Sequence, residues 1–115
     1  MSTNSKISVM LPDGSIKAIY CHFDGYVSGV GVELLTYFDT YEKALELVEG
    51  GDIESISSGI IKRMNGINDE PYIHPNRNDF MSYCEEYMYL FLDNRWILVD
   101  NVCDNKIEGV VINLI

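Results

Sequence analysis

The sequence predicts a single α+β domain, in which about five antiparallel strands pack with two to three short helices. The chain has 115 residues, of which 47% are hydrophobic, enough for one modest core and too apolar for a disordered chain. Apolar residues alternate with other side chains over 7–11 and form short strand-length runs over 87–99, whereas between about residues 30 and 48 they recur at helical spacing. We therefore treat 1–115 as one domain with an N-terminal hairpin and a C-terminal meander.

The N-terminal hairpin begins with a strand over 7–11, where Ile7, Val9 and Leu11 alternate with other side chains. Pro12-Asp13-Gly14 forms the turn, because proline presets φ and glycine accepts a positive φ. The second strand spans 15–23. Both of its faces are largely apolar, so we expect it in the interior of the sheet.

Two helices follow. In the first, over 29–38, Val30, Leu34 and Phe38 recur every four residues, and Ser28 is positioned to cap the first free N–H groups. The second opens at Asp39, with Glu42 three residues on in the pattern of a capping box.

The region 52–78 is rich in Ser, Gly, Asn and Pro, and we expect it to be an irregular surface region. Phe80, Tyr83, Cys84 and Tyr87 then have amphipathic helical spacing, with Asn78 or Asp79 as the cap. Strands over 87–92 and 95–99 flank an Asp93-Asn94 turn, and a last strand covers 107–114.

The formal charge of −10 argues against nucleic acid and anionic membranes as partners, since phosphate affinity comes from Lys and Arg. A basic protein surface is the partner that this charge favours. No apolar run is long enough to span a membrane, and the N-terminus lacks the features of a signal peptide. Cys21, Cys84 and Cys103 form no Cys-x-x-Cys pair, which fits free thiols in a reducing cytoplasm.

The acidic charge is concentrated between residues 24 and 54, where eight acids and one lysine account for −7 of the total. An acidic stripe runs along the second helix, because Glu42, Glu46 and Glu49 fall at i, i+4 and i+7. Asp52 extends this stripe beyond the helix. Like charges at this spacing slightly destabilise a helix, so the stripe serves solubility or binding. These four residues are the candidate binding face.

A second candidate site lies at the strand-turn-helix over 21–31. It comprises His22, Asp24, Tyr26, Gly29 and Gly31. The free N–H groups at the helix start are suited to a small anion, and His22 beside Asp24 to acid–base or metal chemistry. The structural alternatives are that the two glycines serve close packing, that His22 forms a local hydrogen bond and that Asp24 caps the turn.

Cys21 and His22 are neighbours on a strand and point to opposite faces, so they do not form a catalytic pair, and Cys21 is expected to be a small buried side chain. We assign no catalytic residue, metal or cofactor, and whether the chain is an enzyme stays open.

The motif Tyr20-Cys-His-Phe-Asp-Gly-Tyr26 also resembles the core of a family of small phage and prophage proteins of unassigned function. Further matching segments are Ser2-Thr3-Asn4-Ser5, Gly29-Val-Gly31, Leu34-Leu35-Thr36-Tyr37, Gly51-Asp52-Ile53 and Asp93-Asn-Arg-Trp96. The resemblance covers about residues 1–56 and 83–100. The chain departs from the usual core of the family in having Phe23 where Trp is common and Val27 where Pro is common. It implies an accessory protein in an infected bacterial cytoplasm and no catalytic residues.

Two functional hypotheses follow. The first is a non-catalytic inhibitor of a host nucleic-acid-binding defence system, of the anti-CRISPR or anti-restriction type, acting through the acidic face and exposed tyrosines. The second is a protein that binds or hydrolyses a small molecule or nucleotide signal at the 21–31 turn.

Overall fold

The computed structural model describes residues 3–63, 70–82, 85–100 and 108–111. The described strands are β1 (Ser5–Met10), β2 (Ile16–Cys21), β3 (Ile53–Ser57), β4 (Ile60–Arg63), β5 (Tyr72–His74), β6 (Tyr87–Leu92), β7 (Arg95–Asp100) and β8 (Glu108–Val111). The described helices are the π-helical turn η1 (Val27–Gly31), α1 (Val32–Tyr37), α2 (Tyr41–Glu49) and α3 (Arg77–Met81).

All eight described strands belong to one sheet, in the order β4-β3-β2-β1-β6-β7-β8, with β5 paired to β2 beside this path. The β1–β6 and β2–β3 pairs are parallel and the other five pairs are antiparallel. The prediction of an α+β domain with an antiparallel sheet and short helices is confirmed, except that two of the strand pairs are parallel. The N-terminal hairpin and the C-terminal meander join into this sheet because β1 pairs with β6, and the sheet has more strands than the five or so expected.

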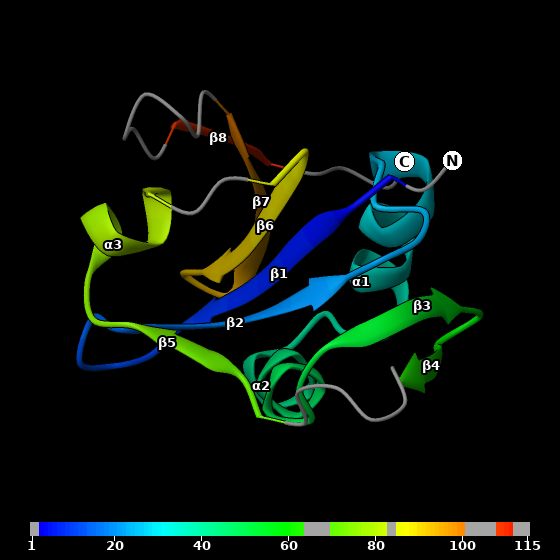
Figure 1. Cartoon of the computed structure of the whole chain (residues 1–115), viewed down its shortest axis with the longest axis horizontal. Helices are drawn as coiled ribbons and strands as arrows, with labels where there is room; N and C mark the ends of the chain where they lie inside the picture. Colours follow the sequence, from blue (N-terminus) through cyan, green and yellow to red (C-terminus); the bar gives the residue numbers. More distant parts are fainter. Residues whose placement is uncertain (1–2, 64–69, 83–84, 101–107, 112–115) are drawn as a thin grey trace.

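The sheet buries side chains on both faces. Along β1, Ile7 and Val9 belong to the core cluster that includes α1 and α2, whereas Met10 packs against the cluster that includes α3. Figure 1 shows α1 and α3 on opposite sides of the central strands, with α3 next to β5. Strand β2 likewise buries residues on both faces, as its two apolar faces predicted.

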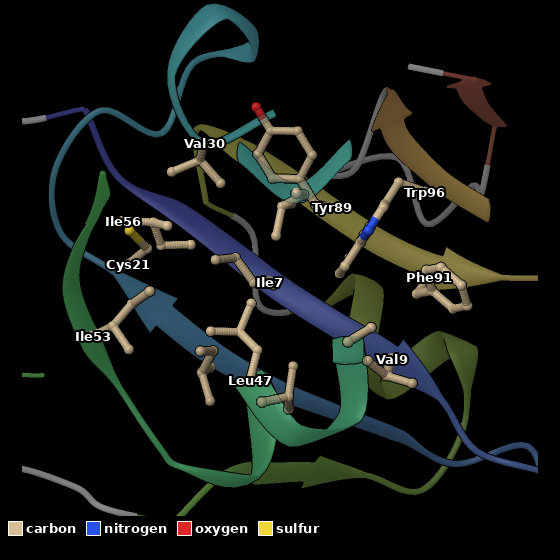
Figure 2. Close-up of a cluster of buried hydrophobic side chains, with 14 residues drawn as sticks. Ile7, Val9, Cys21, Val30, Leu47, Ile53, Ile56, Tyr89, Phe91 and Trp96 are labelled. Carbon is tan, nitrogen blue, oxygen red and sulfur yellow. The ribbon is translucent and has the colours of Figure 1, made fainter. Parts of the chain in front are cut away.

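The larger core cluster joins the centre of the sheet to α1 and α2. Figure 2 shows Ile7 and Val9 of β1, Leu47 of α2 and the rings of Tyr89 and Trp96 converging on one another. Trp96 is 1% exposed and packs edge-on against Phe91, with ring centroids 5.2 Å apart. Trp96 therefore belongs to the core.

Two long-range hydrogen bonds attach the helical segment to the meander. The Tyr89 hydroxyl donates to the Gly25 carbonyl oxygen at 2.7 Å, and the Trp96 indole N–H donates to the Phe38 carbonyl oxygen at 2.7 Å. Each of these two residues therefore buries its aromatic ring and uses its polar atom to donate a hydrogen bond to a backbone carbonyl oxygen. The segment between β2 and α2 is thus fixed at both ends.

The tight turns follow the chemistry of their residues. Gly14 has φ +89° and donates to the Leu11 carbonyl oxygen, while the Asp13 carboxylate accepts from the Ser15 backbone and hydroxyl, so the Pro12-Asp13-Gly14 turn is confirmed. Asp93 and Asn94 have φ of 54° and 61°, and Leu92 pairs with Arg95 across them. This is the geometry of a two-residue hairpin turn, as predicted.

The prediction of an irregular region over 52–78 is wrong, because this stretch contributes β3, β4 and β5 to the sheet. Ser58 and Gly59 have φ of 51° and 77° and form a two-residue turn between β3 and β4. The Gly59 backbone N–H also donates to Glu33 Oε1 at 2.8 Å, which ties this turn to α1. Within 52–78, residues 64–69 lie outside the described residues.

The helix starts also differ from the expected ones. Ser28 lies inside η1 and does not cap it, since the N-cap is Tyr26 without a side-chain bond. The cap of α2 is Thr40 and not Asp39: its hydroxyl accepts from the Lys43 backbone N–H at 3.2 Å. For α3 the cap is Asn76, two residues before Asn78 and three before Asp79, and the helix ends at Met81. Tyr83 and Cys84, which the longer helix would have included, lie outside the described residues.

Candidate functional site

The predicted acidic face lies on α2, and its first two glutamates are free of ion pairs with described residues. Glu42 and Glu46 are both exposed and stand four residues apart, one turn along the helix. Lys43, between them in sequence, pairs with Asp39 at 3.7 Å. The outer surface of α2 therefore presents two uncompensated carboxylates.

The other two residues of this face have structural partners. Glu49 accepts from Lys17 Nζ at 3.1 Å, an ion pair between the end of α2 and strand β2. Asp52 Oδ1 accepts from the Tyr20 backbone N–H at 2.9 Å. The predicted face thus divides into Glu42 and Glu46, which have no such partner among the described residues, and Glu49 and Asp52, which link α2 and the following loop to β2.

Asp52 occupies a gap in the edge of β2. Residues Ile16–Ala18 of β2 pair with β5, and Cys21 pairs with Ile53 of β3, so Tyr20 falls between the two partner strands. The Asp52 carboxylate supplies the acceptor that neither strand provides there. A buried backbone N–H without an acceptor is costly, so this bond stabilises the junction.

The second predicted site, at the 21–31 turn, is not a convergent cluster. His22 Nδ1 lies 2.8 Å from the Tyr20 hydroxyl, whereas Asp24 Oδ1 accepts from the Tyr26 hydroxyl at 3.0 Å. His22 thus forms the local hydrogen bond of the structural alternative, and its bonded partner is a tyrosine rather than Asp24. Strand β2 ends at Cys21, two residues before the predicted end at 23, so His22 and Asp24 both lie beyond the strand.

The glycines of the turn are explained by packing. Asp24 has φ 57° and its carbonyl oxygen accepts from the Val30 backbone N–H, which closes the turn. A Cβ on Gly29 would collide with the Asp24 carbonyl oxygen, and one on Gly31 would meet Val27 at 3.3 Å and the Tyr89 hydroxyl at 3.4 Å. The backbone approaches other protein atoms at these positions, as the close-packing alternative predicted.

Cys21 is fully buried, and it is the free cysteine of the described chain. Burial raises the pKa of its thiol to about 11, and weaker hydrogen-bond effects from the Phe23 backbone and the Ser5 side chain oppose this shift without cancelling it. The thiol is therefore protonated at neutral pH and behaves as a small buried side chain, as predicted.

The described residues contain no group of three or more His, Cys, Asp or Glu side chains arranged to hold a metal ion. His74, the second histidine, lies far along the chain in β5, and its Nδ1 is 2.7 Å from Asp79 Oδ1.

A cleft of about 220 Å³ opens beside the Asp52 junction and contains residues that the sequence did not single out as a site. Its polar lining comes from β1, β2, β5 and the segments that precede β3 and β6, namely Lys6, Tyr20, Asp52, Tyr72, His74 and Glu85. Lys6 and His74 are 8% and 1% exposed, so two ionisable groups are almost completely buried at this cleft. None of the three main clefts in the described part of the chain is lined by residues 21–31.

One sequence signal could have pointed to this cleft. Lys6 directly precedes the alternating residues of the first strand, and a lysine buried in a central strand is unusual. His74 carried no such signal, because its role depends on the pairing of β5 with β2.

Comparison of the chain with protein-family models, with curated proteins and with solved structures found no match. Among the described helices, none has the length and apolar character needed to cross a bilayer.

Proposed function

We propose that the chain is a non-catalytic binding protein that uses the exposed acidic surface of α2 to engage a basic surface on another protein. The observation that carries this proposal is the pair Glu42 and Glu46, exposed one turn apart on α2 without an ion pair to any described residue. Complementary charge speeds encounter and selects partners, so an uncompensated acidic helix favours a basic target.

The attachment of α2 to the sheet supports this use. Ala44, Leu47 and Val48 are buried against the core, and Arg63 Nη1 donates to the Leu47 and Gly51 carbonyl oxygens at 3.4 and 3.0 Å. A helix held in this way presents its outer carboxylates on a rigid support, so little ordering is needed on binding.

The resemblance to small phage proteins adds a finer hypothesis about the target. A groove that binds nucleic acid is basic, and an acidic protein can occupy it in place of the phosphates. We therefore propose a nucleic-acid-binding defence complex of the host as the target, with the protein acting as an anti-CRISPR or anti-restriction inhibitor in the bacterial cytoplasm.

The test is a phage challenge of bacterial strains that each carry one defined restriction or CRISPR system and express the protein. We expect plating efficiency to rise with the wild type in at least one strain and to fall back with the double variant Glu42→Lys/Glu46→Lys. The purified defence complex from that strain should bind the wild type, and the association rate should fall steeply as salt rises.

A matched control variant distinguishes the effect of the acidic surface of α2 from the effect of net charge. Glu70→Lys/Glu86→Lys reverses two exposed acids outside α2, and because each reversal adds two charge units, both variants have a net charge of −6 instead of −10. The control should retain inhibition. Equal loss in both variants would show that only net charge matters, and no protection in any strain would remove the defence hypothesis.

A further inference from the structure

The cleft between β1, β2 and β5 combines apolar walls with buried charge. Its floor includes Lys6 and Tyr20, which are direct neighbours across the β1–β2 pair, and Ala18. Its wall is β5, where Tyr72 pairs with Ala18 and His74 pairs with Ile16. The lining is mainly apolar, with a few polar groups, which is the general composition of small-molecule sites.

The basic end of the cleft is held by α3. Lys6 Nζ lies 5.1 Å from the centre of the Phe80 ring, a cation–π contact, and the His74 ring is edge-on to the same ring at 5.5 Å. His74 Nδ1 faces Asp79 Oδ1, and the Asp79 backbone N–H donates to the Asn76 cap at 2.9 Å. The carboxylate can only accept, so the neutral ring carries its proton on Nδ1 and its Nε2 is an acceptor.

The carboxylates of the cleft act on Tyr20, whereas Lys6 acts on His74. Burial raises the pKa of Tyr20, and the negative charges of Glu85 and Asp52 add to this effect. At the basic end, burial lowers the pKa of His74, and the positive charge of Lys6 lowers it further. The electrostatic potential in the cleft therefore changes sign between Lys6 and the carboxylates of Asp52 and Glu85.

This polarity restricts the class of ligand. A simple cation would meet the buried Lys6, and a simple anion would meet Asp52 and Glu85, whereas a molecule with both charges suits both ends. The ammonium of Lys6 has three N–H donors, and Asp52 retains a second carboxylate oxygen beside the one bonded to Tyr20. The volume of about 220 Å³ is below the range of about 300–1,000 Å³ typical of drug-sized ligands.

We propose that this cleft binds a small zwitterion of the amino-acid type, with its carboxylate toward Lys6, its ammonium toward Asp52 and Glu85, and its apolar side chain between Tyr20 and Tyr72. Tyr20 is suited to the role of a fixed wall, because its hydroxyl is bonded to His22 Nδ1 at 2.8 Å. Tyr72 is 52% exposed and forms the outer wall. The site is independent of the acidic surface of α2.

The test uses L-leucine, L-methionine and L-phenylalanine as probes, with phenethylamine and 3-phenylpropionate as analogues that each lack one charge. Binding is measured by calorimetry on the full chain, and amide chemical shifts locate the site. We expect at least one amino acid to bind and both analogues to bind at least about tenfold more weakly, because each loses a charge-assisted contact. The shifted amides should cluster at residues 6, 18, 20 and 72–74.

Two exposed tyrosines provide matched variants. Tyr72→Ala should weaken binding, whereas Tyr37→Ala, which removes a 44% exposed ring from α1, should leave it unchanged. Glu42→Lys/Glu46→Lys should also bind the amino acid normally, which separates this site from the proposed protein interface. Failure of all three amino acids to bind, equal binding of either analogue, or normal binding by Tyr72→Ala would overturn the proposal.

Discussion

Several residues of the Tyr20–Tyr26 motif act through their backbone or through local bonds. Gly25 is buried, and a Cβ there would come within 2.8 Å of the Asn4 backbone. Its carbonyl oxygen accepts from Tyr89, and its N–H donates to the Thr3 carbonyl oxygen. The motif therefore specifies a turn that packs against the N-terminal segment and β6, which accounts for these residues without a ligand.

Cys21 provides a prediction about chemical reactivity. In a Cys84→Ser/Cys103→Ser background, a thiol reagent should fail to label the native protein at about pH 8 and should label it fully in urea. The thiolate is the reactive form, and the raised pKa of about 11 leaves the buried Cys21 thiol protonated in the native protein. Mass spectrometry of the labelled protein checks this. Rapid labelling of the native protein would show that Cys21 is accessible and ionised.

His74 provides a prediction about pH. Burial lowers its pKa in the folded state, while Asp79 opposes this shift and Lys6 adds to it. Above about pH 6.5, the pKa of histidine in the unfolded chain, the neutral His74 makes its full contribution to stability. As the pH falls below this value the unfolded chain binds the proton first, so stability decreases until the pH reaches the pKa of His74 in the folded state. The loss is at most about 1.4 kcal/mol per pH unit.

Urea unfolding of the wild type and of His74→Gln at about pH 7.5 and about pH 5.5 measures this effect. The wild type should lose more stability than the variant over this interval. Because both proteins retain His22 and the carboxylates, their other titrations largely cancel. An equal loss in both proteins would mean that His74 titrates alike in the folded and unfolded states.

At the scale of the elements, one edge of β2 pairs with both β5 and β3, and Asp52 supplies the hydrogen-bond acceptor between them. Asp52→Ala should destabilise the fold by about 1–2 kcal/mol, because the Tyr20 N–H loses its acceptor. Asp52→Asn keeps an oxygen at that position and should retain most of the stability. Urea denaturation of the two variants tests this, and equal stability of the alanine and asparagine variants would show that the bond contributes nothing.

The sequence predicted the elements whose signals are local. The bounds of β6 match the predicted strand, since a continuous run of apolar and aromatic residues over 87–92 ends at a turn that Asp93 and Asn94 identify. Strands β3 and β4 were missed because Ser55, Ser57 and Ser58 resemble loop composition, and the buried Ile53 and Ile56 are too few to show a period. Their pairing depends on Ser58 adopting a positive φ, which serine seldom does.

The parallel β1–β6 pair could not be predicted from local sequence. It joins Ser5 to Tyr87 and Val9 to Phe91, residues about 80 positions apart, and no local pattern encodes such a pairing. The exposure of Glu42 and Glu46 on α2 could be predicted, because it follows from helical periodicity. The sequence did not locate the cleft, because Lys6, Tyr20 and His74 come together only when β5 pairs with β2.

Taken as a whole, the molecule carries a large excess of negative charge on a compact fold. The radius of gyration is 12.6 Å, so ten uncompensated charges lie within tens of ångströms of one another. At about 0.01 M salt the screening length is about 30 Å, and most of these charges repel one another, whereas at about 1 M it is about 3 Å and the repulsion is nearly removed. Self-repulsion of this kind destabilises the compact state.

We therefore expect the melting temperature to rise as sodium chloride increases between these limits. The described ion pairs act in the opposite direction, but three of the four include a side chain that is at least half exposed and contributes little. Glu42→Lys/Glu46→Lys, with a net charge of −6 instead of −10 after two reversals, should show a smaller rise. Replacing chloride by another weakly interacting anion controls for specific ion effects. A melting temperature that falls with salt in the wild type would show that attraction within ion pairs outweighs the net repulsion.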